Sequence, residues 1–249
     1  MSDTPRELKS WEETLPMVLG LQKDNCLGLE LDFLHGISLK VGGLGELVEI
    51  GTNIGQSTIA LAHAQKQNGG RPVHTVDIYE HADSAANFDV TDVSSHVIRI
   101  VQASSSAASE WTRPIEFLWI DGDHSYQGVT TDIRAWSRFV VPGGFIAFHD
   151  CPGVDGTIEV WQAIHEELLS KPQTWRVFSD RENGSHILML ERLRADPAGE
   201  SSGQPPSSGV YWFYRNVRSA FFQAFPGLSR AAVGLAMKLK ALFKAPPRR

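Results

Sequence analysis

The sequence has few cysteines and no long apolar run. Its two cysteines, Cys26 and Cys151, stand far apart and form no Cys-x-x-Cys pair, which excludes a disulfide scaffold and argues against a structural zinc site. No stretch of about 18 apolar residues occurs, so we predict no membrane-spanning helix. Residues 1–10 lack the basic start and apolar core of a signal peptide, and we expect a cytoplasmic protein.

Acidic residues are missing from the end of the chain. From Ser201 onward there are eight basic residues and no acid, whereas the first 200 residues carry 15 basic and 29 acidic side chains, a net charge of -14. The overall net charge of -6 therefore joins an acidic body to a basic tail. An acidic body disfavours nonspecific binding to nucleic acid, and we expect no nucleic-acid partner.

Short apolar runs alternate with helical stretches from Leu47 onward. Such runs predict strands buried on both faces, hence a parallel sheet with helices on each side. Asn183-Gly184, between the last two runs, is typical of a hairpin turn, so the last strand is expected to run antiparallel. The predicted architecture is an α/β, Rossmann-like sheet of seven strands, mostly parallel, with an antiparallel last strand. The predicted strands are residues 47–50, 73–78, 97–101, 115–120, 145–148, 175–178 and 186–190.

Composition divides the rest of the chain. Residues 1–44 predict an N-terminal helical cap, and residues 195–209, rich in Pro, Gly and Ser, a flexible linker. Residues 210–249 combine basic side chains with apolar residues at helical spacing, which predicts an amphipathic helical tail.

Three interpretations of this tail stay open. It packs on its own domain or on a sister subunit, it lies on an anionic membrane surface such as the inner face of the cell membrane, or it binds an acidic substrate or partner. We expect a homo-oligomer, such as a dimer.

A glycine-rich loop follows the first predicted strand. Residues 49–55, Glu-Ile-Gly-Thr-Asn-Ile-Gly, place an acid and two glycines where a buried strand turns into a helix. Glycine lets the backbone pass close to a ligand. The segment lacks the second glycine of Gly-x-Gly-x-x-Gly and the Gly-Lys of a P-loop, which favours a ligand with an adenosine but no phosphate. A plain glycine turn is the alternative.

The second predicted strand ends in an acid, Asp77, 26 residues after Gly51. A carboxylate at this place in a nucleotide-binding sheet accepts hydrogen bonds from ribose hydroxyls. The alternative is that Asp77 only caps the following helix.

Acids and histidines follow the fourth and fifth predicted strands. The fourth runs into residues 121–126, Asp-Gly-Asp-His-Ser-Tyr, and the fifth into residues 149–151, His-Asp-Cys. Ligands of an open parallel sheet bind at the carboxyl ends of its strands, so we expect Asp121 and Asp150 to face one site. His124 and His149 have a suitable pKa for a general base, and Asp121 can accept a proton or bind a metal. In the alternative, His149 bonds a neighbouring loop and Asp123 caps a helix.

Other polar residues carry no such signal. Asp132 falls within the predicted helix 126–139 and is interpreted as structural. The remaining histidines show no spacing typical of metal ligands.

Together these motifs resemble the class I S-adenosylmethionine (SAM)-dependent methyltransferases over residues 45–192. The matching parts are residues 49–57, Asp77, the strand at 116–121 and residues 141–146, whose Pro142-Gly143-Gly144 is similar to the turn before the fifth strand of that family. The resemblance implies that residues 45–194 form a SAM-binding domain, with the methionine part of SAM near Glu49 and the ribose on Asp77. The implied cofactor-binding residues are Glu49, Gly51, Thr52, Asn53, Gly55, Ser57, Asp77, Ile78, Ser104 and Asp121.

The strand-end residues resemble bacterial sugar and natural-product O-methyltransferases and are similar to metal-dependent catechol-type enzymes. The latter hold Mg²⁺ with an acid after strand four and an acid–Asn pair after strand five. Asp121 and Asp150 match the two acids, and Cys151 stands where the asparagine would be. The resemblance implies Asp121, His124 and His149 as catalytic residues and Asp121 and Asp150 as ligands of Mg²⁺.

The predicted function is transfer of a methyl group from SAM to a hydroxyl of a carbohydrate, such as an oligosaccharide, a polysaccharide precursor or a glycosylated metabolite. Such a hydroxyl has a high pKa, so a base or a divalent cation must assist loss of its proton. Three alternatives remain: a phenolic or other small natural-product acceptor, a non-catalytic binding subunit, and an NAD(P)-dependent oxidoreductase. The missing second glycine disfavours the last of these.

Overall fold

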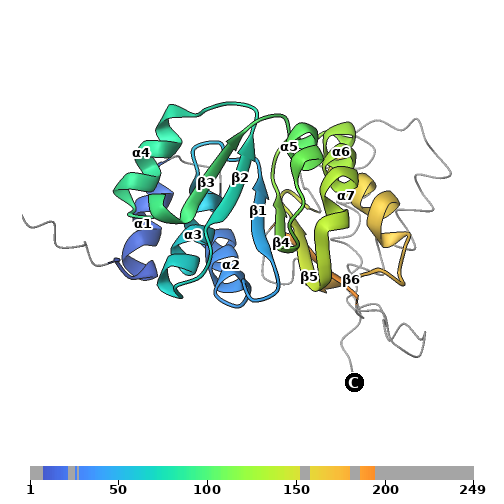
Figure 1. Cartoon of the computed structure of the whole chain (residues 1–249), viewed down its shortest axis with the longest axis horizontal. Coiled ribbons are helices and arrows are strands. Elements are labelled where there is room, and N and C mark those ends of the chain that lie inside the picture. Colours follow the sequence, from blue (N-terminus) through green and yellow to red (C-terminus); the bar gives the residue numbers. More distant parts are fainter. Residues whose placement is uncertain (1–7, 22–25, 27, 152–157, 180–185, 194–249) are drawn as a thin grey trace, which may run out of the picture.

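The computed structural model of the chain describes residues 8–21, 26, 28–151, 158–179 and 186–193 (Figure 1). The predicted turn at Asn183-Gly184, the linker at 195–209 and the tail at 210–249 lie outside the described residues.

Seven strands form one sheet in the order β3-β2-β1-β4-β5-β7-β6. The pairs among the first five strands are parallel, whereas β7 runs antiparallel to both β5 and β6. The predicted mostly parallel sheet with an antiparallel last strand is therefore confirmed. The strands are β1 (Glu46–Ile50), β2 (Val73–Asp77), β3 (Val97–Val101), β4 (Ile115–Ile120), β5 (Val140–Phe148), β6 (Trp175–Ser179) and β7 (Leu188–Arg192).

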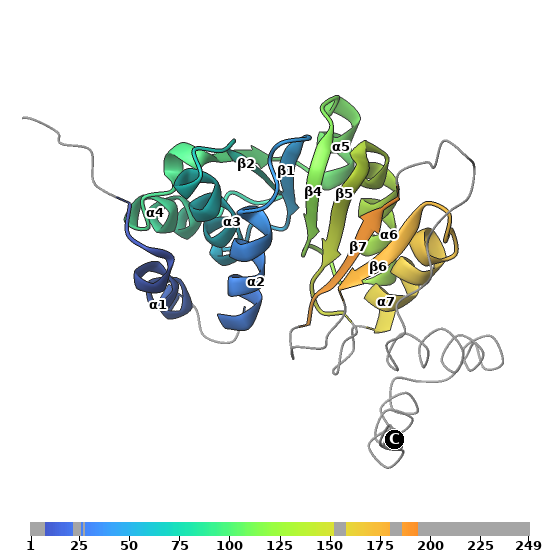
Figure 2. The same ribbon diagram turned by 90° about the horizontal axis from the view of Figure 1, so that it is seen from below.

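Helices cover both faces of this sheet, with α1 to α4 on one side and α5 to α7 on the other (Figure 2). Along β4, Phe117 and Trp119 pack into the first layer, and Leu118 and Ile120 into the second. Burial on both faces explains the continuous apolar runs. The helices are α1 (Trp11–Leu21), α2 (Gly28–Ser38), α3 (Gln56–Gln67), α4 (Ala82–Val90), α5 (Ser104–Glu110), α6 (Tyr126–Trp136) and α7 (Ile158–Ile164). Two short 3₁₀-helices, η1 (Ser94–His96) and η2 (Ser137–Phe139), and one π-helical turn, η3 (His165–Leu169), complete them.

Strand β5 begins earlier than the sequence predicts. Val140 pairs with Ile115 and Phe145 pairs with Phe117, so the intervening residues of β5 form a bulge. The predicted turn at 142–144 lies inside this bulge. A Cβ on Gly144 would come within 2.8 Å of the Glu116 carbonyl oxygen, which requires glycine there.

The N-terminal helices pack on α3. Gln56 donates a hydrogen bond to the Val18 carbonyl at 2.8 Å, and the Trp11 indole donates to Asp32 at 2.7 Å. Trp11 also stacks on His35, with 4.4 Å between ring centroids. The helices predicted within residues 1–44 thus cover one face of the sheet. Within the described part of the chain, no helix is both long and apolar enough to cross a membrane.

Candidate active site

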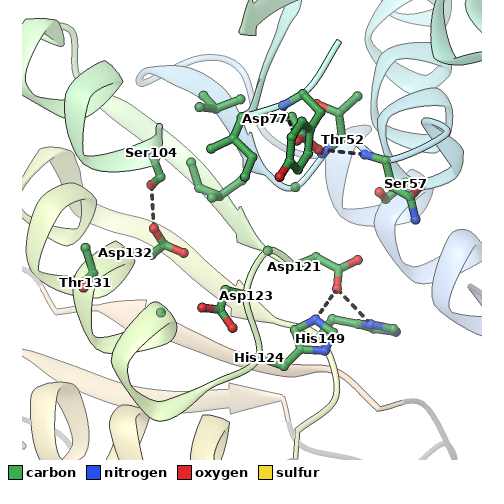
Figure 3. A pocket seen from close by; sticks show the side chains of 18 of the residues that line it. Thr52, Ser57, Asp77, Ser104, Asp121, Asp123, His124, Thr131, Asp132 and His149 are labelled. Carbon is green, nitrogen blue, oxygen red and sulfur yellow. Dashed lines mark hydrogen bonds and ion pairs between the residues drawn. The ribbon is translucent and has the colours of Figure 1, made fainter. Parts of the chain in front are cut away.

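A cavity of about 790 Å³ lies where the carboxyl ends of β1, β2, β4 and β5 meet (Figure 3). Its volume is in the range of small-molecule sites. The predicted residues that line it are Gly51, Thr52, Asn53, Ser57, Asp77, Ile78, Ser104, Asp121, His124, His149 and Asp150. Glu49 and Gly55 are not among its lining residues.

Asp77, at the end of β2, holds the loop that follows β1. One of its carboxylate oxygens accepts hydrogen bonds from the backbone N–H groups of Thr52, at 2.9 Å, and Asn53, at 3.0 Å. The other accepts from the N–H of Tyr79 at 3.0 Å. A carboxylate has about four acceptor positions, so Asp77 keeps acceptor capacity at the cavity wall.

The two glycines of this loop, Gly51 and Gly55, are needed for different packing contacts. A Cβ on Gly51 would lie 2.3 Å from the Asp121 carbonyl oxygen, so glycine lets the ends of β1 and β4 approach. A Cβ on Gly55 would lie 2.3 Å from the Phe88 ring of α4. Both have positive φ angles, 99° and 90°. Gly55 is therefore required by helix packing, and its contact with a cofactor stays a prediction.

Glu49 lies fully buried beneath the loop. Its carboxylate accepts hydrogen bonds from the hydroxyls of Ser57 and Thr75, each at 2.6 Å, and from Thr58. Burial raises the pKa of Glu49 to about 7, although the hydroxyl donors oppose this shift. Glu49 thus anchors the first turn of α3 and β2, and its predicted direct contact with the cofactor remains untested.

Ser104, at the start of α5, belongs to a largely buried cluster of hydrogen-bonded side chains. The cluster lies at the other end of the cavity from Asp77. The Ser104 hydroxyl donates to Asp132 at 2.5 Å and accepts from the Trp136 indole at 2.9 Å. Burial raises the pKa of Asp132 to about 6. The hydrogen bond with Ser104 agrees with the interpretation of Asp132 as a structural residue. Asp132 also lines the cavity, however. Only the packing of α5 on α6 brings it there.

The strand-end residues form one chain of contacts. Oδ1 of Asp121 lies 3.2 Å from Nε2 of His124 and 3.0 Å from Nδ1 of His149 (Figure 3). Oδ2 of Asp150 lies 2.9 Å from Nδ1 of His124. The structure thus brings Asp121 and Asp150 to one side of the cavity, as the sequence predicts.

These carboxylates favour the protonated histidines. Hydrogen bonds to Asp121 and Asp150 raise the pKa of His124 to about 9. Burial lowers the pKa of His149, but hydrogen bonds to Asp121 and Glu30 outweigh it and raise the pKa to about 11. The side chain of His124 is 39% exposed and that of His149 only 8%, so His124 is the ring that a second substrate can reach.

No sequence pattern pointed to Glu30. This acid of α2 is 1% exposed, and its Oε2 lies 3.2 Å from Nε2 of His149. It stands 119 residues from His149 in the chain, so only the tertiary fold brings the two together.

The donor atoms near Asp121 differ from those of a magnesium site. Mg²⁺ prefers oxygen ligands, whereas Asp121, His124 and His149 bring one oxygen and two nitrogens within 4.8 Å of one another, a set more typical of zinc-like ions. The two acids predicted as ligands are each paired with an imidazole, and Cys151 is fully buried. These residues do not fit Mg²⁺.

The strand order with its reversed last strand, and the cavity at the ends of β1, β2 and β4, fit the fold of the class I methyltransferases that the sequence resembles. Residues 48–151 match the family model described as a methyltransferase domain. The matched segment runs from β1 to Cys151 and includes the glycine loop, Asp77 and the strand-end acids and histidines. This segment, 104 of the 249 residues, is therefore similar to a methyltransferase domain.

Solved structures of other proteins share this fold. An O-methyltransferase from Bacillus cereus in complex with SAH, the demethylated product of SAM, is 20% identical with a TM-score of 0.56, over 76% of this chain and 93% of that one. The O-methyltransferase TomG from Streptomyces achromogenes, in complex with SAM, is 16% identical with a TM-score of 0.57, over 74% and 92%. At these identities the likeness establishes the fold alone.

One similar curated protein, the uncharacterized protein R132 of Acanthamoeba polyphaga mimivirus, is 36% identical over 52 residues. That match covers 21% of this chain and 24% of the viral protein, so the chain matches about a quarter of this relative.

Proposed function

We propose that the protein is a SAM-dependent O-methyltransferase. The observation that carries this proposal is that one cavity joins a nucleoside-type wall, around Asp77 and Ser104, to the acid–histidine chain at the ends of β4 and β5. The SAH- and SAM-bound structures of the Bacillus cereus and Streptomyces achromogenes proteins, which share the fold, support the choice of cofactor.

The charge of the cavity suits a cationic donor. Its described lining residues include five aspartates against two histidines, and no lysine or arginine. Such walls favour the positive sulfonium of SAM. The ribose hydroxyls would donate to Asp77, and the adenine would lie near Ser104. Ile78 and Tyr79, whose exposed fractions are 58% and 66%, form an apolar rim that the base would cover.

His124 is our candidate for the general base. The acceptor oxygen attacks the methyl carbon in line with the sulfur, the carbon–sulfur bond breaks, and its electron pair leaves on SAH. The hydroxyl proton passes to Nδ1 of a neutral His124 once the acceptor hydroxyl has displaced Asp150 from that nitrogen, and Asp121 on Nε2 and the nearby Asp150 stabilise the imidazolium that forms. The sulfonium of bound SAM opposes a positive charge on His124 and so favours its neutral form.

We propose a carbohydrate hydroxyl as the acceptor. An alkyl hydroxyl is a very weak acid and needs a strong base, whereas a phenol, with a pKa of about 10, ionises more easily. The two carboxylates beside His124 make it a stronger base than an isolated histidine, which favours the more demanding acceptor.

Calorimetry with SAM, SAH and NAD tests the cofactor. We expect SAM and SAH to bind and NAD not to bind; binding of NAD with no binding of SAM would overturn the proposal.

Transfer of a labelled methyl group from SAM to methyl glycosides and to catechol tests the acceptor. We expect transfer to a glycoside and activity that survives exhaustive EDTA treatment. Transfer to catechol alone would make the acceptor phenolic. Loss of activity that only Mg²⁺ restores would return Asp121 and Asp150 to the predicted metal-binding role.

A further inference from the structure

Glu30 is a buried acid that connects three distant parts of the chain. Its Oε2 lies 3.2 Å from Nε2 of His149, at the end of β5. Its Oε1 accepts a hydrogen bond from the backbone N–H of His186, just before β7, at 2.8 Å. A carboxylate with 1% exposure is costly to bury unless its oxygens are paired. Glu30 thus joins α2 to the edge of the sheet where the cavity lies.

The imidazole of His149 is held from both sides. Its Nε2 faces Glu30, and its Nδ1 lies 3.0 Å from Oδ1 of Asp121. Each carboxylate accepts a hydrogen bond, so both ring nitrogens act as donors and the ring has one orientation. Without a partner on Nε2, this constraint on the ring would be lost.

Asp121 connects the held ring of His149 to the ring of His124. The oxygen that accepts from His149 also lies 3.2 Å from Nε2 of His124. Glu30 does not line the cavity, whereas Asp121, His124 and His149 do. An effect of Glu30 on the exposed His124 must therefore pass through His149 and Asp121.

We propose that Glu30 is a positioning residue of the active site. It holds His149, which fixes the carboxylate of Asp121 and thereby the ring of His124 beside the acceptor. The N-terminal helix α2 is then part of the catalytic apparatus and not only a cover of the sheet. The effect of Glu30 on catalysis rests on the proposed function. The coupling between the His149 and His124 rings, however, can be measured without a methyl acceptor.

The test compares Glu30→Gln with Asp32→Asn. Glutamine keeps the size of Glu30 and an oxygen for the His186 N–H. Asp32 lies on the same helix, its carboxylate accepts from the Trp11 indole at 2.7 Å, and it does not line the cavity. The Asp32 variant therefore controls for a general weakening of α2.

The main readout is the proton–nitrogen NMR spectrum of full-length, EDTA-treated protein with labelled histidine rings. His149→Gln and His124→Gln assign the two signals. We expect Glu30→Gln to shift the ring signals of both His149 and His124, and Asp32→Asn to leave both in place. A His124 signal that stays at its wild-type position in Glu30→Gln would overturn the proposal, whether or not the His149 signal moves.

The second readout is kinetic, with a glycoside or catechol found to accept the methyl group. We expect Glu30→Gln to lower kcat by roughly 10- to 100-fold, as loss of an orienting partner commonly does, with SAH affinity unchanged. In the His149→Gln background the same change should have little further effect, because the path is already broken. Two fully independent losses would overturn the proposed path. If SAM and SAH do not bind at all, the proposed function fails, while the NMR comparison still decides the role of Glu30.

Discussion

Asp77 shows how one side chain combines a structural and a ligand-binding role. Its carboxylate already accepts three backbone N–H groups, two from the glycine loop and one from Tyr79. Asp77 also lines the cavity. Its loss should therefore affect both the shape of the loop and the binding of ribose.

We predict that Asp77→Ala weakens SAH binding roughly 10- to 100-fold, the effect of losing charge-assisted hydrogen bonds. Calorimetry measures this directly. Asp83→Ala is the matched control, because Asp83 is an exposed acid in the first turn of α4 that does not line the cavity. An unchanged SAH affinity in Asp77→Ala would show that the ribose binds elsewhere.

His124 sets the predicted pH dependence. Its pKa is raised to about 9, so its neutral, basic form grows as the pH rises toward that value. We expect the rate of methyl transfer at saturating substrates to increase with pH between neutrality and about 9, with the midpoint lowered by the charge of bound SAM. His124→Gln should remove this rise, whereas His96→Gln, outside the cavity, should keep it. A rate that falls over the same range would exclude His124 as the base.

At the scale of elements, the packing of α1 and α2 on α3 contains a buried pair of histidines. Nε2 of His35 lies 3.1 Å from Nδ1 of His63, and Nε2 of His63 lies 2.9 Å from the Lys9 carbonyl oxygen. Burial and the neighbouring His63 lower the pKa of His35 to about 4. The nearby charged groups are Glu12 on α1, Asp32 on α2 and Lys66 on α3.

This pair predicts a loss of stability in mild acid. Below the ordinary pKa of about 6.5 the unfolded chain binds a proton at His35, whereas the folded chain does so only near 4. The contribution of His35 to the free energy of unfolding is fully present above pH 6.5 and is lost as the pH falls to 4. By pH 5 the loss is about 2 kcal/mol.

Denaturant unfolding at neutral and at mildly acidic pH measures this effect. His35→Gln should reduce the difference in the free energy of unfolding between the two conditions. The same pH dependence in wild type and His35→Gln would contradict the predicted role of His35.

At the scale of the whole molecule, the sheet is complete before the basic tail begins. Its last strand, β7, ends at Arg192. The eight basic residues of the tail follow Ser201, after an acidic body. The residues that the structure describes around the cavity all lie between Ile50 and Asp150.

We therefore predict that a chain ending at Leu193 binds SAH with the affinity of the full-length protein. The same two proteins distinguish the interpretations of the tail by flotation with anionic vesicles and by their size in solution. A membrane-binding tail makes only the full-length protein float, and a tail that joins subunits changes only the size of the full-length protein. Loss of SAH affinity on truncation would show that the tail supports the cavity.

The sequence by itself determined the parts of this protein that depend on local patterns. Continuous apolar runs predict buried parallel strands, and the strand-end positions of Asp77, Asp121, His124, His149 and Asp150 follow from where those runs stop. The carboxyl ends of parallel strands meet at one edge, so these residues converge once the sheet is predicted.

Only the tertiary structure decided which other groups reach that edge and what charge they carry. Glu30 touches His149 across 119 residues, Asp132 enters the cavity through the packing of α5 on α6, and Glu49 lies beneath the loop instead of in the cavity. The pKa values of His124 and His149 depend on carboxylates that converge only on folding. Burial and long-range contact act between segments distant in sequence, and for that reason no local pattern could specify them.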